Sequence, residues 1–396
     1  RDLIMHPTRL ESDLELYTDE ALTNPYPIYK ELRDMESPVW LNAYGAYVLS
    51  RYDDVRAALE NNEVFSSAKG VSLNDHMNEA LAGGLLCSDP PNHDVLRKII
   101  ERPLLPKQLT VLRQQIVEEA ERHVEQLVKK DRFEVITELA QHLPVTIVSN
   151  LVGLPEAGRE RMLDWAPANF NCFGPADSTL TQSSFPILEE MVKYALEECV
   201  PEKLKPGGWA AQIWEAADRG EISHATCPKL MNDYMGPSLD TTIFATASAI
   251  WLFSQHPEQW DILRANPALI PNAINEVVRM ESPVTAFSRM TTRDYEMSGH
   301  TIPEGSRVIV LYGSANRDER HWGNPETFDV RRNNVSEHMG FGFGEHQCVG
   351  NNLARLEIRA LLAALVKHVE RFELKDVEWT KNNALRGISR CNVEIH

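Results

Sequence analysis

The chain has 396 residues, of which 43% are hydrophobic and 25% are charged, and its formal net charge is −18. The length allows a large buried core, and the composition is that of an ordinary globular protein. The excess of acidic residues argues against nucleic acid as a partner, because phosphate binding needs clustered Lys and Arg.

No apolar run reaches the roughly 18 residues that a membrane helix needs, since the candidates 246–253 and 360–366 are too short. The N-terminal residues contain no signal-peptide core. The six cysteines are scattered without a CxxC pair, which favours a reducing compartment and gives no zinc-site spacing. We therefore expect a cytoplasmic protein without a membrane partner. The absence of linkers and repeats favours one domain over residues 1–396.

Strand patterns come first in the chain and helical patterns follow. The runs 39–41 and 46–49 predict a β-hairpin. Apolar residues at helical spacing, with charged residues between them, predict helices over 109–128 and 187–204. Residues 257–280 predict two helices separated by an Asn-Pro break.

The C-terminal part begins with a second pair of strand patterns. Residues 295–302 and 307–312 predict two paired strands joined by the turn Pro303-Glu304-Gly305. Residues 351–371 predict a long helix with an apolar stripe. Together the patterns predict a mainly α fold with small peripheral β-sheets.

The segment 341–350 reads Phe-Gly-Phe-Gly-Glu-His-Gln-Cys-Val-Gly and directly precedes the predicted helix that starts at Asn351. A cysteine just ahead of a helix N-terminus lies near free N–H donors and a positive dipole end, so Cys348 can bind a metal as a thiolate. Glycines such as Gly350 let the backbone approach a flat ligand, and Phe341 can lie against it. An isolated cysteine is more often a small buried hydrophobe, but the whole pattern is far more specific than one cysteine.

This segment resembles the haem-binding loop of the cytochrome P450 family, the haem-thiolate monooxygenases, and the resemblance covers nearly the whole chain. It implies a helical prism around a buried haem b. It also implies that Cys348 is the proximal ligand of the iron and that His346 contacts a haem propionate. A thiolate ligand pushes electron density onto the iron and favours O–O cleavage. The co-substrate would be O2, with electrons from a ferredoxin and an NAD(P)H-dependent ferredoxin reductase.

Other segments resemble the same family. Glu276 and Arg279 lie three apart, where they can pair on a helix; in the family such a pair bonds to a later arginine, here Arg331 or Arg332. This pair alone is a weak signal, because any helix surface can carry one.

His93 and Arg97 lie four apart, so they share one helix face and suit a pair of carboxylates. An ordinary amphipathic helix would look the same. The resemblance makes both residues propionate contacts, and it adds Arg289 as a third. Burying propionates without such partners would cost several kcal/mol per charge, as a rough estimate.

Asp240 and Thr241 match the acid and the alcohol of the family's oxygen-activating helix. A hydroxyl backed by a carboxylate can deliver protons to oxygen; without the cysteine motif, bonds to the helix's own carbonyls would be the simpler interpretation. Pro237 and Ser238 depart from the family pattern. Since proline removes a helix hydrogen bond, Pro237 is expected to fix a kink beside the oxygen pocket.

The substrate residues follow from a narrower resemblance, to bacterial O-demethylases of para-substituted benzoic acids. Aromatic rings around one cavity suit a flat aromatic guest, although core packing would also explain them. Lys69 and Ser72 could hold the carboxylate of a substrate. A buried Asp233 would repel a carboxylate, so a neutral phenol or alkyl-methoxyphenol is an alternative substrate. The predicted pocket residues are Lys69, Ser72, Phe170, Phe173, Asp233, Pro237, Val284 and Phe287.

The sequence thus predicts O-demethylation of a small methoxyaromatic substrate. The alternatives are hydroxylation of a terpene or another compact aliphatic substrate, a haem sensor without turnover, and a helical protein with an inert Cys348. The redox partner is expected to dock on the thiolate side, near Arg102, Arg355 and Arg359.

Overall fold

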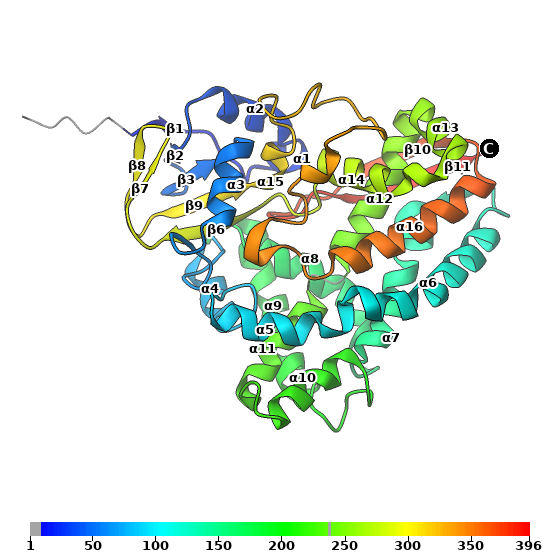
Figure 1. Cartoon of the computed structure of the whole chain (residues 1–396), viewed down its shortest axis with the longest axis horizontal. Helices are drawn as coiled ribbons and strands as arrows, with labels where there is room; N and C mark the ends of the chain where they lie inside the picture. Colours follow the sequence, from blue (N-terminus) through cyan, green and yellow to red (C-terminus); the bar gives the residue numbers. More distant parts are fainter. Residues whose placement is uncertain (1–8, 237–238) are drawn as a thin grey trace, which may run out of the picture.

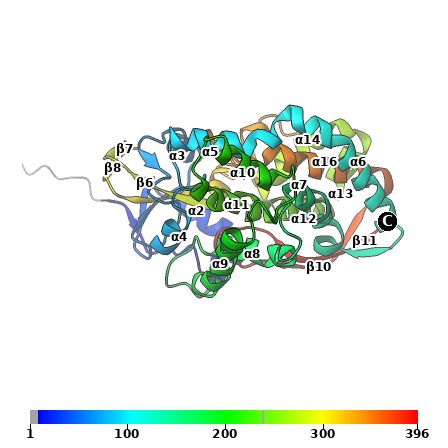
Figure 2. The same cartoon turned by 90° about the horizontal axis from the view of Figure 1, so that it is seen from below.

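A computed structural model describes residues 9–236 and 239–396. Its outline is triangular in one view and thinner in the perpendicular view (Figures 1 and 2). The strands of residues 286–302 lie at one end in both views, and the helices of residues 106–127 and 257–265 lie at the other end with the strand pair of residues 372–379 and 388–395. The predicted mainly α fold with small peripheral sheets is confirmed.

The α-helices, in chain order, are α1 (Asp19–Thr23), α2 (Tyr26–Asp34), α3 (Tyr52–Glu60), α4 (Asp75–Leu81), α5 (Asn92–Glu101), α6 (Pro106–Leu127), α7 (Ser149–Val152), α8 (Met162–Asn171), α9 (Thr179–Glu197), α10 (Trp209–Asp218), α11 (Cys227–Met235), α12 (Asp240–Gln255), α13 (Pro257–Ala265), α14 (Ile270–Met280), α15 (Tyr312–Ala315) and α16 (Asn351–His368). The strands, in the same order, are β1 (Glu11–Ser12), β2 (Val39–Leu41), β3 (Ala46–Leu49), β4 (Phe65–Ser66), β5 (Arg132–Glu134), β6 (Ala286–Thr291), β7 (Tyr295–Met297), β8 (His300–Ile302), β9 (Arg307–Leu311), β10 (Phe372–Trp379) and β11 (Ile388–Ile395).

The predicted helices are present, but the one expected over 187–204 is displaced along the chain at both ends. The patterns over 109–128 and 351–371 correspond to α6 and α16, and the Asn-Pro break separates α13 from α14. The pattern over 187–204 belongs to α9, which begins earlier because Ser178 caps it by accepting a hydrogen bond from the Thr181 N–H. That helix ends at Glu197, ahead of Pro201, which could not donate the next helical hydrogen bonds.

The first predicted hairpin is confirmed and the second is wrong. β2 and β3 pair antiparallel, with Val39 opposite Val48. β7 pairs with β8 instead of with β9, around Ser298 and Gly299, whose φ angles are 51° and 79°. Two adjacent residues with positive φ close a two-residue hairpin. β9 is therefore available to pair with β6 and, in parallel, with β3.

The prediction for the helix pair was that Glu276 and Arg279 bond to Arg331 or Arg332, and the partner is Arg332. All three side chains are buried. The Arg332 Nε lies 3.0 Å from the Glu276 carboxylate, whereas Arg331 is exposed. This network joins α14 to the segment that leads into the cysteine loop.

The helices that reach the interior are α12 and α16. Most residues of α12 are buried, and it contacts both α14 and α16. None of the described helices is long and apolar enough to cross a bilayer.

Candidate active site

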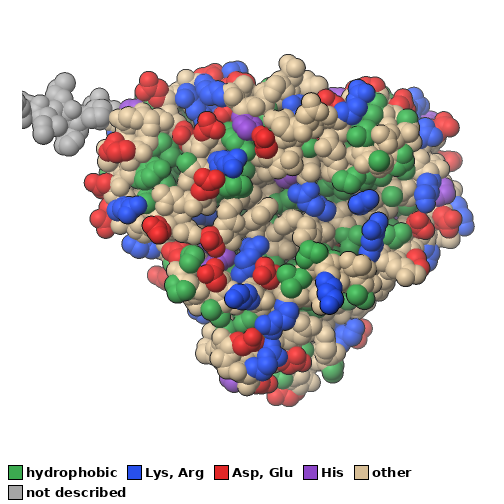
Figure 3. Space-filling model, in the orientation of Figure 1, with side chains coloured by type: hydrophobic (Ala, Val, Ile, Leu, Met, Phe, Trp, Pro, Cys, Tyr) green, Lys and Arg blue, Asp and Glu red, His purple; other side chains and the backbone are tan. Residues whose placement is uncertain are grey.

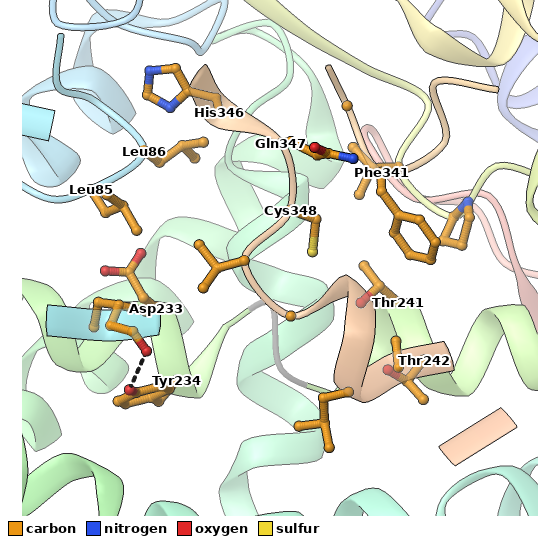
Figure 4. Close-up of a pocket in the computed structure, with 18 of the residues that line it drawn as sticks. Leu85, Leu86, Asp233, Tyr234, Thr241, Thr242, Phe341, His346, Gln347 and Cys348 are labelled. Carbon is orange, nitrogen blue, oxygen red and sulfur yellow. Dashed lines mark hydrogen bonds between the residues drawn. The ribbon is translucent and has the colours of Figure 1, made fainter. Parts of the chain in front are cut away.

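A cavity of about 230 Å³ lies between α5, α11, α12, β6 and the segment 340–350. Figure 4 shows Cys348, Phe341 and Thr241 on one side of the drawn cavity and Asp233 with Leu85 on the other. The cavity brings together most of the predicted site residues, namely His93, Arg97, Phe170, Phe173, Asp233, Thr241, Val284, Phe287, Arg289, Phe341, His346, Cys348 and Gly350.

Two predicted pocket residues are placed elsewhere in the described part of the chain. Lys69 is exposed and does not line the cavity. Ser72 is fully buried, and its hydroxyl donates to the Phe173 carbonyl at 3.2 Å. Ser72 therefore fastens one loop to another instead of facing a substrate. Pro237 lies outside the described residues.

The cysteine loop is held by its own backbone. The Cys348 N–H donates to the Phe341 carbonyl at 2.7 Å. Gly344 has a φ of +75°, and a Cβ there would lie 2.5 Å from the Leu59 carbonyl oxygen, so the loop can approach α3 only with glycine at this position. α16 begins three residues after the cysteine.

Burial raises the pKa of the Cys348 thiol, while the Gly350 N–H and the charges of Arg97 and Arg355 oppose the rise. The helix N-terminus that the sequence pointed to is thus outweighed by desolvation. A buried sulfur in this setting becomes a thiolate when a metal ion binds it, because metal ligation displaces the proton.

Polar side chains that have few partners surround one end of the cavity. The rings of His93 and His346 lie 4.2 Å apart. Both nitrogens of His93 and Nε2 of His346 lack a hydrogen-bond partner among the described residues. Burial lowers the pKa of both histidines.

The two arginines complete this end. Arg97 donates to the carbonyl of Gln347 at 2.7 Å, and the buried Arg289 donates to the carbonyl of Ser288 at 3.0 Å. Arg97 is half-buried and already pairs with Glu101 at 3.2 Å. Arg289 is buried without a carboxylate partner among the described residues, and a buried cation of this kind requires an anionic partner. The arrangement fits a ligand that carries two carboxylates next to a metal above Cys348.

Asp240 and Thr241 begin α12. The Asp240 side chain is buried, its Oδ2 has no hydrogen-bond partner in the described chain, and burial raises its pKa to about 7. Thr241 lines the cavity and Asp240 does not. α11 ends at Met235 and α12 begins at Asp240, and the kink expected at Pro237 lies outside the described residues.

Aromatic rings form the remaining wall. The centroids of Phe173 and Phe287 lie 5.1 Å apart with an edge-to-face geometry, and Phe170 and Phe173 lie 6.2 Å apart. Val284 lies next to them in the cavity lining.

A family model described as "Cytochrome P450" matches residues 263–390. Over 381 residues, the chain is 36% identical to "Cytochrome p450 CYP199A2" of Rhodopseudomonas palustris, and the match covers 95% of this chain and 92% of that protein. The chain belongs to the cytochrome P450 family.

Other relatives agree with this assignment. Linalool 8-monooxygenase of Pseudomonas putida is 30% identical over 404 residues, covering 96% of this P450 and 97% of that protein. The structure of cytochrome P450 CREJ in complex with (4-ethylphenyl) dihydrogen phosphate superposes with a TM-score of 0.84 at 26% identity. That match covers 96% of this chain and 99% of the other. The protein is therefore a monooxygenase that binds haem b, uses O2 and receives electrons from a redox partner.

The sequence did not single out three polar residues of this P450's cavity, Asn169, Asn232 and Glu357. Glu357 is buried, and burial raises its pKa to about 8. The sequence did carry a signal for Glu357. It lies four residues after Leu353, so its side chain lies on the same face of α16 as the apolar stripe. Asn169 and Asn232 carried no signal beyond standing next to Phe170 and Asp233.

Proposed function

We propose that this cytochrome P450 oxidises a compact aromatic substrate by O-demethylation of a para-substituted methoxyaromatic, such as a methoxybenzoate or an alkyl-methoxyphenol. The observation that carries the proposal is the group of Phe170, Phe173 and Phe287 around one cavity, in contact with each other edge to face or tilted. Aromatic walls of this kind favour a flat ring. The CREJ structure, whose ligand carries an ethylphenyl group, supports the same size and shape of guest.

In this proposal Cys348 would be the ligand of the haem iron, and Phe341 and Gly350 would contact the haem. His93, Arg289 and His346 would hold the two propionates, which would supply the partners that these buried groups lack, and the half-buried Arg97, which already pairs with Glu101, would add a further contact. When bound, the haem supplies the activation of O2 that inserts one oxygen atom into a C–H bond of the substrate.

The chain's own residues position the substrate and move protons. The three phenylalanines and Val284 orient the ring with its methoxy group toward the haem. Asp240 holds a proton at a pKa of about 7 and, with the Thr241 hydroxyl, delivers protons to the oxygen pocket. Hydroxylation of the methyl carbon gives a hemiacetal, which collapses to a phenol and formaldehyde.

Electrons would come from a ferredoxin and its NAD(P)H-dependent reductase, with the ferredoxin bound on the face of α5, α6 and α16. Figure 3 shows Lys and Arg side chains gathered across the middle of this face, despite the net charge of −18. Arg359 and Lys98 are exposed there. Of the other expected contacts, Arg102 pairs with Glu221 at 3.0 Å, and Arg355 bonds to Asn275 and lies over the Phe341 ring.

Charge reversal tests the docking face. Arg359→Glu should slow reduction by ferredoxin and leave substrate affinity unchanged, because the side chain is exposed on the helix that follows the cysteine loop. Arg293→Glu, an exposed arginine between β6 and β7, is the matched control. Equal rates of reduction in the two variants would show that ferredoxin does not dock on this face.

A second candidate function is hydroxylation of a terpene, which the similarity to linalool 8-monooxygenase favours. Binding titrations with 4-methoxybenzoate, 4-alkylguaiacols and linalool, followed by the haem absorbance, separate the two candidates. We expect an aromatic series to bind and to release formaldehyde on turnover. If linalool alone binds and is hydroxylated, the aromatic proposal is wrong.

A further inference from the structure

Asp233 lines the cavity from α11, and the proposed proton delivery and haem binding do not use it. Its Oδ2 atom is buried and has no hydrogen-bond partner in the described ranges. In the view of Figure 4 it lies on the side of Leu85, away from Cys348 and Thr241. Its carboxyl group therefore faces the end of a substrate that is remote from the reacting carbon.

Two amides add to this polar wall. The Oδ1 atoms of Asn169 and Asn232 are buried without a hydrogen-bond partner among the described side chains and backbone groups, and both residues line the same cavity. Asn169 lies beside Gly236, where a Cβ would come within 3.0 Å of its Nδ2. A buried polar group without a partner costs about 1–3 kcal/mol. Such a wall is stabilised by a ligand that donates a hydrogen bond.

No basic side chain is placed to receive a carboxylate at this wall. Among the described residues that line the cavity, the cationic or basic ones are His93, Arg97, Arg289 and His346, which we assign to the propionates. Lys69 is exposed. An anionic substrate group beside Asp233 would be desolvated without a countercharge, which is strongly unfavourable.

We propose that Asp233, with Asn169 and Asn232, selects a substrate that carries a phenolic hydroxyl opposite the reacting methoxy group, and that it rejects a carboxylate there. The inference rests on the proposed aromatic ether substrate and specifies which polar group this substrate carries opposite its methoxy group.

A neutral hydroxyl fits better than an ammonium group. The side chains of Leu85 and Leu86 are part of the same lining, and burial raises the pKa of Asp233 to about 8. A carboxyl group that keeps its proton near neutral pH can accept from a phenol and donate to it. An ammonium ligand would instead require the carboxyl group to ionise inside the protein.

The test uses the haem-loaded protein and four ligands that share a 4-methoxyphenyl ring: 4-methoxyphenol, 4-methoxytoluene, 4-methoxybenzoate and 4-methoxybenzylamine. Dissociation constants are measured by haem absorbance and independently by calorimetry. The variants are Asp233→Leu, Asp233→Asn and, as a control for the same Asp-to-Asn change outside the cavity, the exposed Asp261→Asn.

We expect the wild-type protein to bind 4-methoxyphenol about tenfold more tightly than 4-methoxytoluene, which corresponds to one hydrogen bond. The wild-type protein should bind 4-methoxybenzoate about tenfold more weakly than 4-methoxyphenol, because the carboxylate would have no countercharge at this wall. Asp233→Leu should remove the preference for 4-methoxyphenol over 4-methoxytoluene, whereas Asp233→Asn, which keeps a neutral group that donates and accepts hydrogen bonds, should retain it. Asp261→Asn should change neither value.

An unchanged ratio of phenol to toluene affinity in Asp233→Leu would overturn the inference, as would tighter binding of the amine than of the phenol. Absence of binding by every ligand would overturn the aromatic substrate class and this inference with it. The first two outcomes leave the proposed function standing, so the two failures can be told apart.

Discussion

In the network that joins α14 to the segment before the cysteine loop the buried charges are paired, whereas the buried carboxyl groups of α11 and α12 are not fully paired. Glu276 is bonded to Arg279 and Arg332 with no exposed surface of its own. By contrast, Asp233 and Asp240 each have a carboxylate oxygen without a hydrogen-bond partner among residues 9–236 and 239–396. The α14 network is complete as a folded structure, whereas His93, His346 and Glu357 near Cys348 also have buried polar atoms without a partner in the described chain.

The difference distinguishes residues that stabilise the fold from residues that act on a ligand or a proton. Paired buried charges fix one backbone arrangement without help from a ligand, and breaking them is costly. Unpaired buried carboxyl groups lower stability and are retained where a ligand or a proton is to be handled. The α14 network thus serves as scaffold for the cysteine loop, and we infer that the unpartnered groups around the cavity meet the cofactor, the substrate or a proton.

The largest expected effect comes from breaking the ion-pair network of Glu276, Arg279 and Arg332. Arg332→Ala leaves the Glu276 carboxylate without one of its buried partners, and we expect a loss of about 3–5 kcal/mol in the free energy of unfolding. Arg331→Ala, next to it in the chain and exposed, should cost no more than about 0.5 kcal/mol. Denaturant unfolding of the haem-loaded protein measures both, and equal losses would contradict the comparison.

In α12, Asp240→Asn should lower turnover about a hundredfold, the usual contribution of a positioned proton donor. Substrate affinity should stay within about twofold, because Asp240 does not line the cavity. Product formation and a binding titration measure the two quantities. Loss of affinity with normal turnover would place Asp240 in substrate binding instead.

A smaller effect is expected in the cysteine loop. Gly344→Ala would put a Cβ 2.5 Å from the Leu59 carbonyl oxygen, and Gly305→Ala meets nothing within 4 Å, although both glycines have positive φ. Both variants lose about 1 kcal/mol from backbone strain, and Gly344→Ala should lose about 1–3 kcal/mol more from overpacking. Thermal unfolding measures the difference. Identical losses would mean that the loop does not depend on its contact with α3.

The smallest effect concerns pH. The folded-state pKa of Asp233 is raised to about 8 by burial, so the folded protein binds this proton more tightly than the unfolded chain does. Stability is then lost as the pH rises from the ordinary Asp pKa toward 8, and Asp233→Asn escapes this loss. Its neighbours Cys87 and Tyr234 also have raised pKa values and stay neutral over this range.

The measurement for this effect is the free energy of unfolding at pH 7 and pH 8 without substrate. The advantage of Asp233→Asn over the wild-type protein should grow between the two, on the order of 1 kcal/mol. Glu357 and Asp240 titrate equally in both proteins, so their contributions to the difference in the free energy of unfolding cancel. A constant difference would mean that Asp233 is ionised throughout.

Much of the fold and of the thiolate side could be predicted from the sequence, because both depend on local patterns. The helices over α6, α13, α14 and α16 follow from apolar spacing and a proline break, and the cysteine motif carries its own glycines. The strand pairing of β7 with β8 was missed because the Ser298-Gly299 turn competes with the more obvious Pro-Glu-Gly turn.

The side of the cavity opposite Cys348 was harder to predict because its properties depend on contacts between distant segments. Lys69 and Ser72 have suitable chemistry for an anion, but one points to solvent and the other bonds to the Phe173 carbonyl. Whether Asn169 faces the cavity is decided by the packing of α8 against α11 and α12, which no local pattern reports.

The central claim is that Cys348 supplies a thiolate to the haem iron. The most direct measurement is the absorbance spectrum of the reduced, haem-loaded protein under carbon monoxide. We predict the long-wavelength Soret band that marks thiolate ligation and its loss in Cys348→Ala. A spectrum typical of histidine-ligated haem in the wild-type protein, or purified protein that binds no haem, would contradict this claim.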